Sequence, residues 1–478
     1  MREEDSGVRD RRNRLSPAAV LLTVCLLTAF LGKTPLCSPS PRSSSAITLD
    51  GSQPAEAVPG EILVKFKEPV LAAAQVQMQE ALGFQELGRI EGLGVMRVGV
   101  KPGLTPEEAA RLYEARPEVE YAEPNYVLHS DGVPSDPLFA GQQQWYYDLI
   151  QAPPAWDIET GDPSVVVAVL DTGVDITHPD LKDGIWTNPA EVAANNKDDD
   201  DNGCVDDIHG CNFAPSISSS SCHYKNTPNS EIGDDDGHGT FVAGIIAARA
   251  NNQIGVAGTA PNVTIMPVKV LDCSGAGTAD SAAAGVLYAA RAGAHVLNIS
   301  FGGDQESQTV RDAIRQAHDV YGTVIVSSAG NTASAQVAFP ARLDEVIAVS
   351  ASDRNNPDAK ATFSNWGSGI DVAAPGVDIV STLPQRLCGE SWPCLGGQPY
   401  ATGKGTSFSA ALVSGAAALI LSRSPTLSPD EVARHLIETA APMPDGSFAG
   451  WAGAGRVQIA QALQSPIYRV GVSGVVKN

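Results

Sequence analysis

The chain has 478 residues, which is too long for one ordinary domain, so we expect two or more folded units. Hydrophobic residues make up 43% of the chain and charged residues 18%, a balance that supplies a sizeable core. The formal net charge of −23 argues against nucleic acid or an anionic membrane surface as a partner, because both are bound through basic patches.

The N-terminus carries the pattern of an export signal. Four arginines between positions 9 and 14 precede an apolar run over about 18–32, and a stretch rich in Ser and Pro follows. A positive segment ahead of a short apolar run is typical of a signal peptide. We therefore expect residues 1–45 to direct secretion. The alternative is that the apolar run stays uncleaved and anchors the protein.

A polar linker over 46–59 leads to a compact segment over 60–130. The expected elements are a strand at 61–67, a helix at 71–82, strands at 85–90 and 95–100, a helix at 105–115 and a strand at 119–128. Thr105 is the expected cap of the second helix, with acidic residues in its first turn. The order β-α-β-β-α-β predicts a small ferredoxin-like α+β unit. By itself, such a unit fits many kinds of binding module.

The segment 131–465 has the pattern of an α/β domain. It is expected to begin with a loop over 131–157, in which Trp145, Tyr146 and Tyr147 act as packing anchors. Uninterrupted apolar strands are expected at 165–170, 263–271, 294–300, 323–328 and 346–350, and helices at 238–250, 278–292, 307–318, 406–421 and 429–439. Apolar runs of this kind are typical of parallel strands that are covered on both faces. The pattern predicts three layers, with a mostly parallel sheet between helices, and a loosely attached tail over 466–478.

Four polar residues stand where such a fold places its chemistry, beyond strand ends and at helix starts. Asp171 follows the strand VVVAVL, and Asn331 follows VIVSSAG. His238 opens an apolar helix, and Ser407 opens the apolar run SFSAALVSGAAALIL. Taken singly, each has an ordinary structural explanation as a turn, core or helix-capping residue. Together, Asp, His and Ser supply an orienting carboxylate, a general base and a nucleophile.

The chain resembles the subtilisin-like serine proteases, the subtilase family, over nearly all of its length after the signal. The matching motifs are VAVLDTGVDITHPDL, DGHGTFVAG, NISFGG, SSAGN and GTSFSAALVSGAAAL, and the segment 60–128 resembles the inhibitor-type propeptide of the family. The resemblance implies a propeptide over 60–130 and a peptidase domain over 131–465. Three positions depart from the family pattern: Phe408 replaces Met, Ala411-Leu412 replaces Pro-His, and Phe241 replaces His.

The resemblance also implies an activity. We expect a secreted serine endopeptidase that is made as a zymogen, cleaves protein or peptide substrates, removes its own propeptide near 129–135 and is monomeric when mature. The propeptide is expected to act as an intramolecular inhibitor. A non-catalytic binding protein and an exopeptidase on the same scaffold are the alternatives.

The family mechanism assigns roles to single residues of this chain. Ser407 is the implied nucleophile, His238 the base and Asp171 the residue that orients the base. Asn331 is the implied side-chain donor to the oxyanion. The implied substrate-binding residues are Ser300, Phe301, Gly302, Ser328, Ala329 and Gly330, with Ala338 near the floor of the primary specificity pocket. An Ala at that place predicts room for a medium-sized apolar side chain.

Two structural calcium sites are expected. The loop KDDDDNGCVDD alternates oxygen ligands before a Gly, which suits a hard cation, and its candidate ligands are Asp198, Asp200, Asn202 and Asp206. The alternative for this loop is a solvated acidic segment. The resemblance implies the second site, with side chains of Asp136, Asp180 and Asn252 and carbonyls of Ala250, Ile254 and Val256.

The cysteines suggest disulfides. Two of the eight lie in the export segment, and the even number that remains fits an exported chain. Cys388 and Cys394 flank a short loop, so we expect them to pair. The other four allow three pairings, among which the sequence does not choose: Cys204, Cys211, Cys222 and Cys273.

Overall fold

The computed structural model describes residues 57–465, apart from 68–69, 91, 102, 127–132, 216–221, 223–228, 390–391, 445 and 447. The chain divides into two compact units, residues 1–127 and 128–478, and each is described by itself. The predicted export segment, most of the predicted linker and propeptide cleavage region, and the predicted tail lie outside the described residues.

The first unit is a four-stranded antiparallel sheet with two helices. Its elements are β1 (Ala57–Phe66), α1 (Ala72–Leu82), β2 (Gln85–Ile90), β3 (Val95–Gly99), α2 (Pro106–Glu114) and β4 (Val119–Tyr126), and the strand order is β2-β3-β1-β4. Thr105 caps α2, since its hydroxyl accepts the N–H of Glu108 at 3.2 Å and its own N–H donates to the Glu108 carboxylate at 2.9 Å. Ile62 and Val64 of β1 alternate into a core that includes Tyr113 of α2. The predicted β-α-β-β-α-β unit is therefore confirmed.

The second unit is built on a seven-stranded sheet in which every neighbouring pair runs parallel. The strands are β5 (Val166–Asp171), β6 (Cys211–Asn212), β7 (Thr264–Lys269), β8 (Val296–Ile299), β9 (Val324–Ser328), β10 (Ile347–Ser352) and β11 (Val372–Pro375), in the order β11-β10-β9-β8-β5-β7-β6. Because β5 lies between β8 and β7, the order of the strands reverses there. Open α/β sheets bind ligands at such a switch point, beyond the carboxyl ends of the strands.

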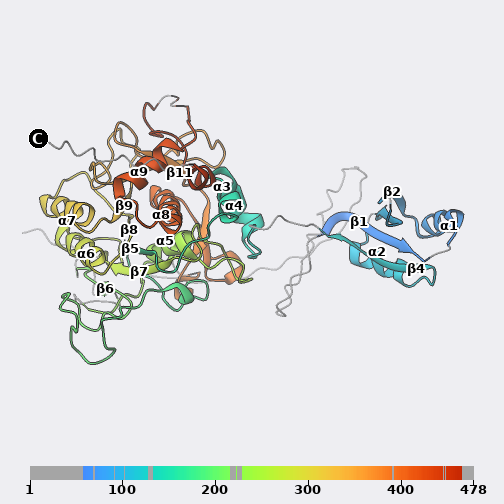
Figure 1. Ribbon diagram of the computed structural model, residues 1–478, viewed down its shortest axis with the longest axis horizontal. Helices are drawn as coiled ribbons and strands as arrows, with labels where there is room; N and C mark the ends of the chain where they lie inside the picture. The colour runs from blue at the N-terminus through green and yellow to red at the C-terminus, as the bar shows by residue number, and fades with distance from the viewer. Residues whose placement is uncertain are drawn as a thin grey trace, which may run out of the picture. The chain divides into compact units, whose positions relative to one another are not determined.

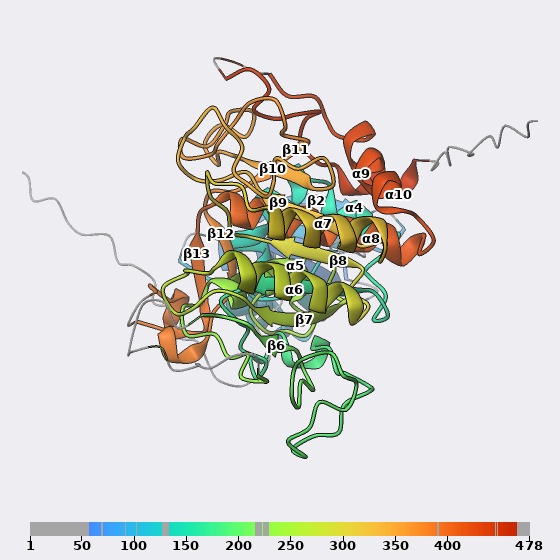
Figure 2. The same ribbon diagram turned by 90° about the vertical axis from the view of Figure 1, so that its left-hand side faces the viewer.

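Helices cover both faces of this sheet, as Figure 1 shows. Helices α5 (His238–Ala247) and α8 (Thr406–Arg423) share one core with Val167 and Val169 of β5. Helices α6 (Ala279–Arg291) and α7 (Gln308–Asp319) cover the opposite face, where Ala168 and Leu170 point, and they lie in front of the strands in Figure 2. Helix α8 is long and apolar enough to cross a membrane, but 89% of it is buried inside this unit. The predicted three-layer α/β domain is confirmed.

The segment before β5 is more ordered than predicted. A π-helical turn (Phe139–Gln143) and helices α3 (Gln144–Leu149) and α4 (Ala152–Trp156) stand where we expected a loop, so that prediction was wrong. The packing anchors are confirmed for Tyr146 and Tyr147, which are fully buried. Their hydroxyls donate to the carbonyls of Val380 at 3.1 Å and Ala257 at 2.9 Å. Tertiary hydrogen bonds of this kind organise short helices that have no periodic pattern.

The remaining elements lie around the main sheet. They are 3₁₀ turns at Lys182–Gly184, Gln385–Leu387 and Leu395–Gly397, the antiparallel pair β12 (Ile379–Thr382) and β13 (Tyr400–Gly403), and helices α9 (Pro429–Glu438) and α10 (Ile459–Gln464). Of these, the sequence predicted α9 alone.

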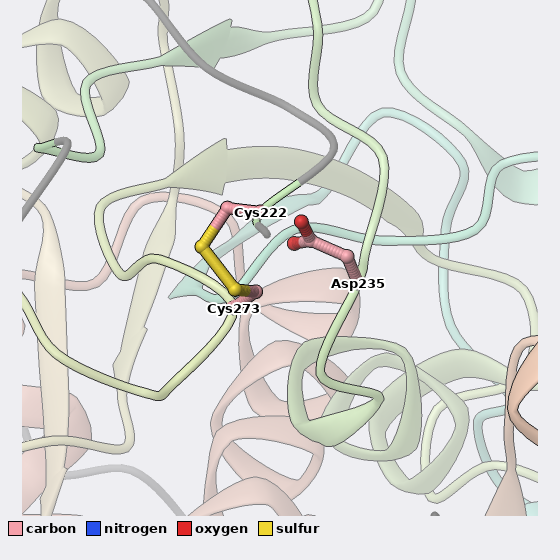
Figure 3. Close-up of side chains that lie close together, drawn as sticks. All are labelled: Cys222, Asp235 and Cys273. Carbon is pink, nitrogen blue, oxygen red and sulfur yellow. A yellow bond between two sulfur atoms is a disulfide. The ribbon is translucent and has the colours of Figure 1, made fainter. Parts of the chain in front are cut away.

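Three disulfides cross-link loops of the second unit. Cys388 pairs with Cys394, as predicted, with Cα atoms 5.3 Å apart. The open pairing is resolved as Cys204–Cys211 and Cys222–Cys273, with Cα separations of 6.2 and 5.4 Å. Figure 3 shows the Cys222–Cys273 bond beside Asp235. This bond joins the loop before α5 to the loop that follows β7.

Candidate active site

Asp171 and His238 are in direct contact. The His238 Nδ1 atom lies 2.8 Å from Oδ1 of Asp171, which also accepts the N–H of Thr172 at 2.8 Å. Asp171 is the last residue of β5 and is fully buried, whereas the side chain of His238, the first residue of α5, is 24% exposed. Because the carboxylate holds Nδ1, Nε2 is the ring nitrogen that remains for a second proton exchange.

The neighbourhood of His238 is strongly acidic. Burial of the imidazole opposes its charged form, but the carboxylates of Asp171, Asp236 and Asp234 outweigh it and raise the pKa of His238 to about 9. Burial raises the pKa of Asp236 as well, and the nearby Asp234 carboxylate adds to this effect. The site therefore stabilises an imidazolium, which is the form that His238 takes after it accepts a proton.

Ser407 lies at the start of α8, one residue after the helix begins. It is 5% exposed, and its hydroxyl donates to the carbonyl of Ser300 at 3.2 Å. The ring of the next residue, Phe408, stacks on the imidazole of His238 with centroids 5.7 Å apart, so the starts of α5 and α8 are neighbours. Among the described residues no hydrogen bond joins His238 to Ser407, a contact that often tightens only when substrate binds.

Asn331 lies beside the start of α8. Its Oδ1 accepts both the N–H and the hydroxyl of Thr406 at 2.9 Å each, which leaves Nδ2 as the donor end of the amide. A Cβ added to Gly405 would lie 3.7 Å from that Nδ2. The donor end of the Asn331 amide therefore lies beside the start of α8, where a helix leaves backbone N–H groups without intrahelical acceptors.

The substrate-binding residues implied by the resemblance fall into two structural groups. Strand β8 ends at Ile299, and pairing resumes at Gly303, which exchanges two 2.9 Å hydrogen bonds with Phe339. The segment 300–302 lies between the end of β8 and this bridge. The backbone of Ala329 is instead bound within the fold, since its N–H donates to Val349 and its carbonyl accepts from Ala338 at 2.9 Å each. The segment 328–330 is therefore a wall of the site rather than a free edge.

One glycine from each of these two segments approaches Ala338. A Cβ added to Gly302 would lie 3.4 Å from the Cβ of Ala338, and one added to Gly330 would lie 3.1 Å from it. Ala338 itself is 7% exposed. The structure thus brings together Gly302, Gly330 and Ala338, for which the resemblance implies a role in substrate binding.

A cavity of about 390 Å³ beside Phe301 and Gly302 was not predicted. Its lining includes Val270, Leu271, Ala276, Ala282, Phe301 and Phe339. The lining also includes the Gly275-Ala276-Gly277 turn that follows β7. That Gly-rich turn after a buried strand was the available signal in the sequence.

The residues of the family-like calcium site lie together. The side-chain amide of Asn252 donates to Asp180 at 2.7 Å, and its backbone N–H donates to Asp136 at 3.2 Å. Burial raises the pKa of both carboxyls, that of Asp180 to about 6, with the charge of Asp136 adding to the effect. Ala250, Ile254 and Val256 belong to the same loop after α5. Two buried carboxylates with an amide oxygen nearby fit a hard divalent cation, which would neutralise them.

The acidic loop brings together two of the four predicted residues, Asp198 and Asp200, with one that was not predicted, Glu191. Carboxylate oxygens of Glu191, Asp198 and Asp200 all lie within 4.8 Å of one another. Oε2 of Glu191 is buried and, within the described part of the chain, has no hydrogen-bond partner. Asp206 binds the N–H groups of Asn195 and Asn196 at 3.0 Å each, away from this group. Glu191 was missed because it lies outside the acidic run.

Asn202 adds to the fit of this loop. Its N–H donates to Asp198 at 3.0 Å and to Asp200 at 3.1 Å, which holds both carboxylates on one side of the turn. Oxygen atoms gathered in this way, with a buried carboxylate oxygen among them, suit a hard cation.

Comparison with protein families gives two matches. Residues 162–458 match the model described as the subtilase family, and residues 43–125 match the fervidolysin N-terminal prodomain. The two matches fall on the larger and smaller folded units, respectively.

Individual relatives are proteases. The chain is 35% identical over 392 residues to a thermophilic serine proteinase of Bacillus sp. (strain AK1), covering 80% of this chain and 83% of that protein. It is 36% identical to thermitase of Thermoactinomyces vulgaris, covering 69% of this chain and 99% of the relative. Among solved structures, a protease of Pseudoalteromonas arctica aligns with a TM-score of 0.56 and 32% identity, covering 69% of this chain and 98% of the other. Fervidolysin from Fervidobacterium pennivorans aligns with a TM-score of 0.55 and 25% identity, covering 87% and 62%.

Proposed function

This chain belongs to the subtilase family of serine proteases, and we propose that it is a secreted endopeptidase, made as a zymogen, whose catalytic residues are Asp171, His238 and Ser407. The observation that carries the proposal is the 2.8 Å contact between the buried Asp171 and His238, at the carboxyl edge of the sheet, where Ser407 is the second residue of α8. Acyl transfer needs a nucleophile near a general base, and a third group that orients the base.

Each residue then has one chemical task. The hydroxyl oxygen of Ser407 attacks the peptide carbonyl, and Nε2 of His238 accepts its proton and passes it to the leaving amine. Asp171 holds the imidazole and stabilises the imidazolium. The tetrahedral oxyanion receives hydrogen bonds from the Asn331 amide and the Ser407 N–H, and its collapse gives an acyl-enzyme that water hydrolyses.

Substrate would bind as an added strand along residues 300–302. Gly302, Gly330 and Ala338 carry small side chains or none and lie close together, and we expect the primary pocket that they would line to accept a medium-sized apolar residue. The apolar cavity beside Phe301 would take a further apolar side chain of the substrate.

The domain plan of the zymogen follows the predicted boundaries. Residues 1–45 would direct export, 46–59 form a linker, 60–130 inhibit and assist folding, 131–465 carry catalysis and 466–478 form a tail. The match of residues 43–125 to a prodomain supports the inhibitory role. Self-cleavage near 129–135 would fall close to the boundary between the two units.

Calcium would be structural rather than catalytic. One ion would be held by Asp136, Asp180 and Asn252 with loop carbonyls, and the other by Glu191, Asp198, Asp200 and Asn202. Their role would be to neutralise carboxylates that otherwise repel one another.

Ser407→Ala tests the proposal. We expect the variant to fold, to keep its propeptide and to lose all peptide hydrolysis, while a fluorophosphonate labels the wild type alone. A processed, labelled Ser407→Ala protein would overturn the assignment, and a folded wild type that resists the label would favour a non-catalytic protein. Internal fragments from casein separate an endopeptidase from an exopeptidase, which would release terminal residues only.

A further inference from the structure

The hydroxyl of Thr172 joins the two chain segments that carry Asp171 and His238. It accepts the N–H of Gly239 at 3.0 Å and donates to Oδ1 of Asp234 at 2.9 Å. Thr172 directly follows Asp171, and Gly239 directly follows His238. One fully buried hydroxyl therefore spans the interface between the end of β5 and the start of α5.

Asp234 extends this link over the first turn of α5. The same Oδ1 accepts the N–H of Gly237 at 2.8 Å, and Oδ2 accepts the N–H of Thr240 at 2.8 Å and its hydroxyl at 2.6 Å. Gly237 directly precedes His238, Thr240 follows it by two positions, and Asp234 is 2% exposed. A buried carboxylate thus satisfies N–H groups at the helix start and holds that start against Thr172.

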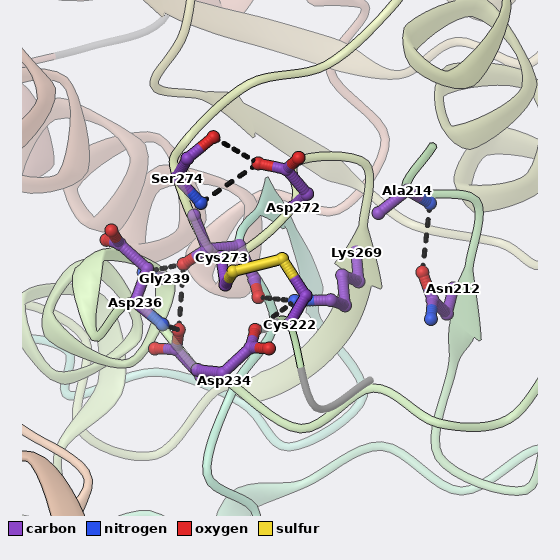
Figure 4. Close-up of polar contacts among 12 residues, drawn as sticks. Asn212, Ala214, Cys222, Asp234, Asp236, Gly239, Lys269, Asp272, Cys273 and Ser274 are labelled. Atoms are coloured by element: carbon purple, nitrogen blue, oxygen red, sulfur yellow. Dashed lines mark hydrogen bonds and ion pairs between the residues drawn. A yellow bond between two sulfur atoms is a disulfide. The ribbon is translucent and has the colours of Figure 1, made fainter. Parts of the chain in front are cut away.

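Lys269 also contacts Thr172, and Figure 4 shows Lys269 near Asp234. Lys269 is the last residue of β7, pairs with Asp171 in the sheet, and donates from Nζ to the carbonyl of Thr172. The ammonium is buried and also lies 2.9 Å from the carboxylate of Asp235. A buried ammonium needs charged or polar partners, and Lys269 has both the Asp235 carboxylate and the Thr172 carbonyl. Its bond to the Thr172 carbonyl fixes the turn after β5.

We propose that Thr172 and Asp234 are positioning residues, which set the placement of His238 relative to Asp171, with Lys269 anchoring the Thr172 carbonyl. The inference rests on the catalytic roles proposed for Asp171 and His238. Those two residues belong to different elements, so their mutual placement depends on what connects the elements. A displacement of about 1 Å in a catalytic group can lower the rate about 100-fold.

The test compares side chains of matched shape at position 172. Thr172→Val removes the hydroxyl and keeps the volume, so we expect kcat to fall about 10- to 100-fold with KM unchanged. Thr172→Ser keeps the hydroxyl, and its kcat should return to within about threefold of the wild type. The full chain is expressed, and active sites are titrated with a fluorophosphonate so that kcat refers to competent molecules. A Thr172→Val enzyme with wild-type kcat would overturn the proposal.

Asp234→Glu provides the second variant, because it keeps the charge near His238 but moves the carboxylate by one methylene. We expect a loss of kcat similar to that of Thr172→Val. Its matched control is Asp371→Glu, since Asp371 accepts the N–H of Ala348 at 2.8 Å at the amino-terminal edge of the sheet. The control should lower the melting temperature without changing kcat. If Thr172→Val does not fold, kcat of Asp234→Glu provides the test instead. An Asp234→Glu enzyme with the kcat of the wild type would overturn the proposal.

Two further variants keep this test separate from the proposed function. Asp171→Asn and Ser407→Ala should each abolish activity if the proposed triad is correct. If both variants lose activity but Thr172→Val keeps its kcat, only the positioning role is contradicted. If Asp171→Asn and Ser407→Ala remain active, the proposed triad itself is contradicted.

Discussion

The ring of Phe408 stacks on the ring of Phe241, with centroids 4.4 Å apart and an angle of 29° between the planes. Phe241 also stacks on Trp392 at 5.5 Å, and Phe408 stacks on the imidazole of His238 at 5.7 Å. Phe241 and Phe408 are two of the departures from the family pattern, and both are buried. The two departures therefore pack against each other and form one aromatic stack that joins the starts of α5 and α8.

A double-mutant cycle should detect this coupling. Phe241→Leu and Phe408→Leu should each destabilise the mature enzyme, but the double variant should lose about 0.5–1.5 kcal/mol less than the sum, because aromatic pairs contribute beyond buried area. Denaturant unfolding at constant calcium measures the three free energies. The control pairs Phe241→Leu with Phe339→Leu, which lies in the core on the opposite face of the sheet and should be additive. Additive losses in the first cycle would contradict direct coupling.

The pH dependence of activity should reflect the acidic surroundings of His238. Since these carboxylates raise its pKa to about 9, the neutral base is scarce at low pH, and the acid limb of kcat/KM should lie above the ordinary histidine range. Asp236→Asn removes one of the negative charges, so the limb should move to lower pH. The exposed and distant Asp319→Asn should leave it in place. A limb that moves to higher pH in Asp236→Asn would contradict the electrostatic account.

The sequence predicted the main α/β elements because their signals are local. Strand β5 follows from VVVAVL, and α8 follows from a long run of small and apolar residues. Strands β6 and β11 were missed because two to four residues carry no period, and β11 ends in a proline. Helix α4 was missed because tertiary contacts define it, such as the 2.8 Å hydrogen bond from the Trp156 indole to the Thr259 carbonyl.

The residues of the candidate site also differ in whether their signals are local in the sequence. Asp171, His238 and Ser407 could be predicted because each stands directly at a strand end or helix start within a recognisable motif. Asp234 and Lys269 could not, since their importance depends on contacts with Thr172 across the fold. Ala411 and Leu412, the third departure from the family pattern, are fully buried in the core that α5 and α8 share.

Removal of calcium should destabilise the mature enzyme through both proposed sites. A site occupied at about 100 times its Kd contributes about 2.7 kcal/mol, so chelation should lower the melting temperature clearly. Glu191→Gln should remove calcium binding, and the stabilisation that it provides, at the acidic loop. Asp180→Asn should do the same at the other site. Titration calorimetry with calcium counts the ions bound by each variant.

Asp206→Asn is the matched control for the acidic loop. Because the Asp206 carboxylate binds backbone N–H groups of Asn195 and Asn196, this variant should still bind calcium there. If Asp206→Asn loses that ion and Glu191→Gln keeps it, the proposed ligand set of Glu191, Asp198, Asp200 and Asn202 is contradicted.

The disulfides should differ in what they contribute to stability. Cys222–Cys273 spans a sequence separation of 51, and Cys388–Cys394 one of 6. The chain-entropy model assigns about 4 kcal/mol to the longer loop and about 2 kcal/mol to the shorter one. Replacing each pair with serine and measuring denaturant unfolding should therefore show the greater loss for Cys222–Cys273. A greater loss for the short loop would mean that loop entropy does not govern these bonds.

Asn331→Asp separates the catalytic amide from its structural role. Because Oδ1 of Asn331 holds Thr406, the aspartate keeps that acceptor and the local fold, but it places an oxygen where Nδ2 stood. The substrate oxyanion would then meet a carboxylate instead of a donor, so kcat should fall at least as far as the about 100- to 1000-fold loss typical of a missing oxyanion donor, with little change in KM. Steady-state kinetics on a peptide anilide measure both constants, and the melting temperature checks the fold. Asn356→Asp, at an exposed and distant position, is the control. An Asn331→Asp enzyme with kcat within about threefold of the wild type would show that other groups stabilise the oxyanion.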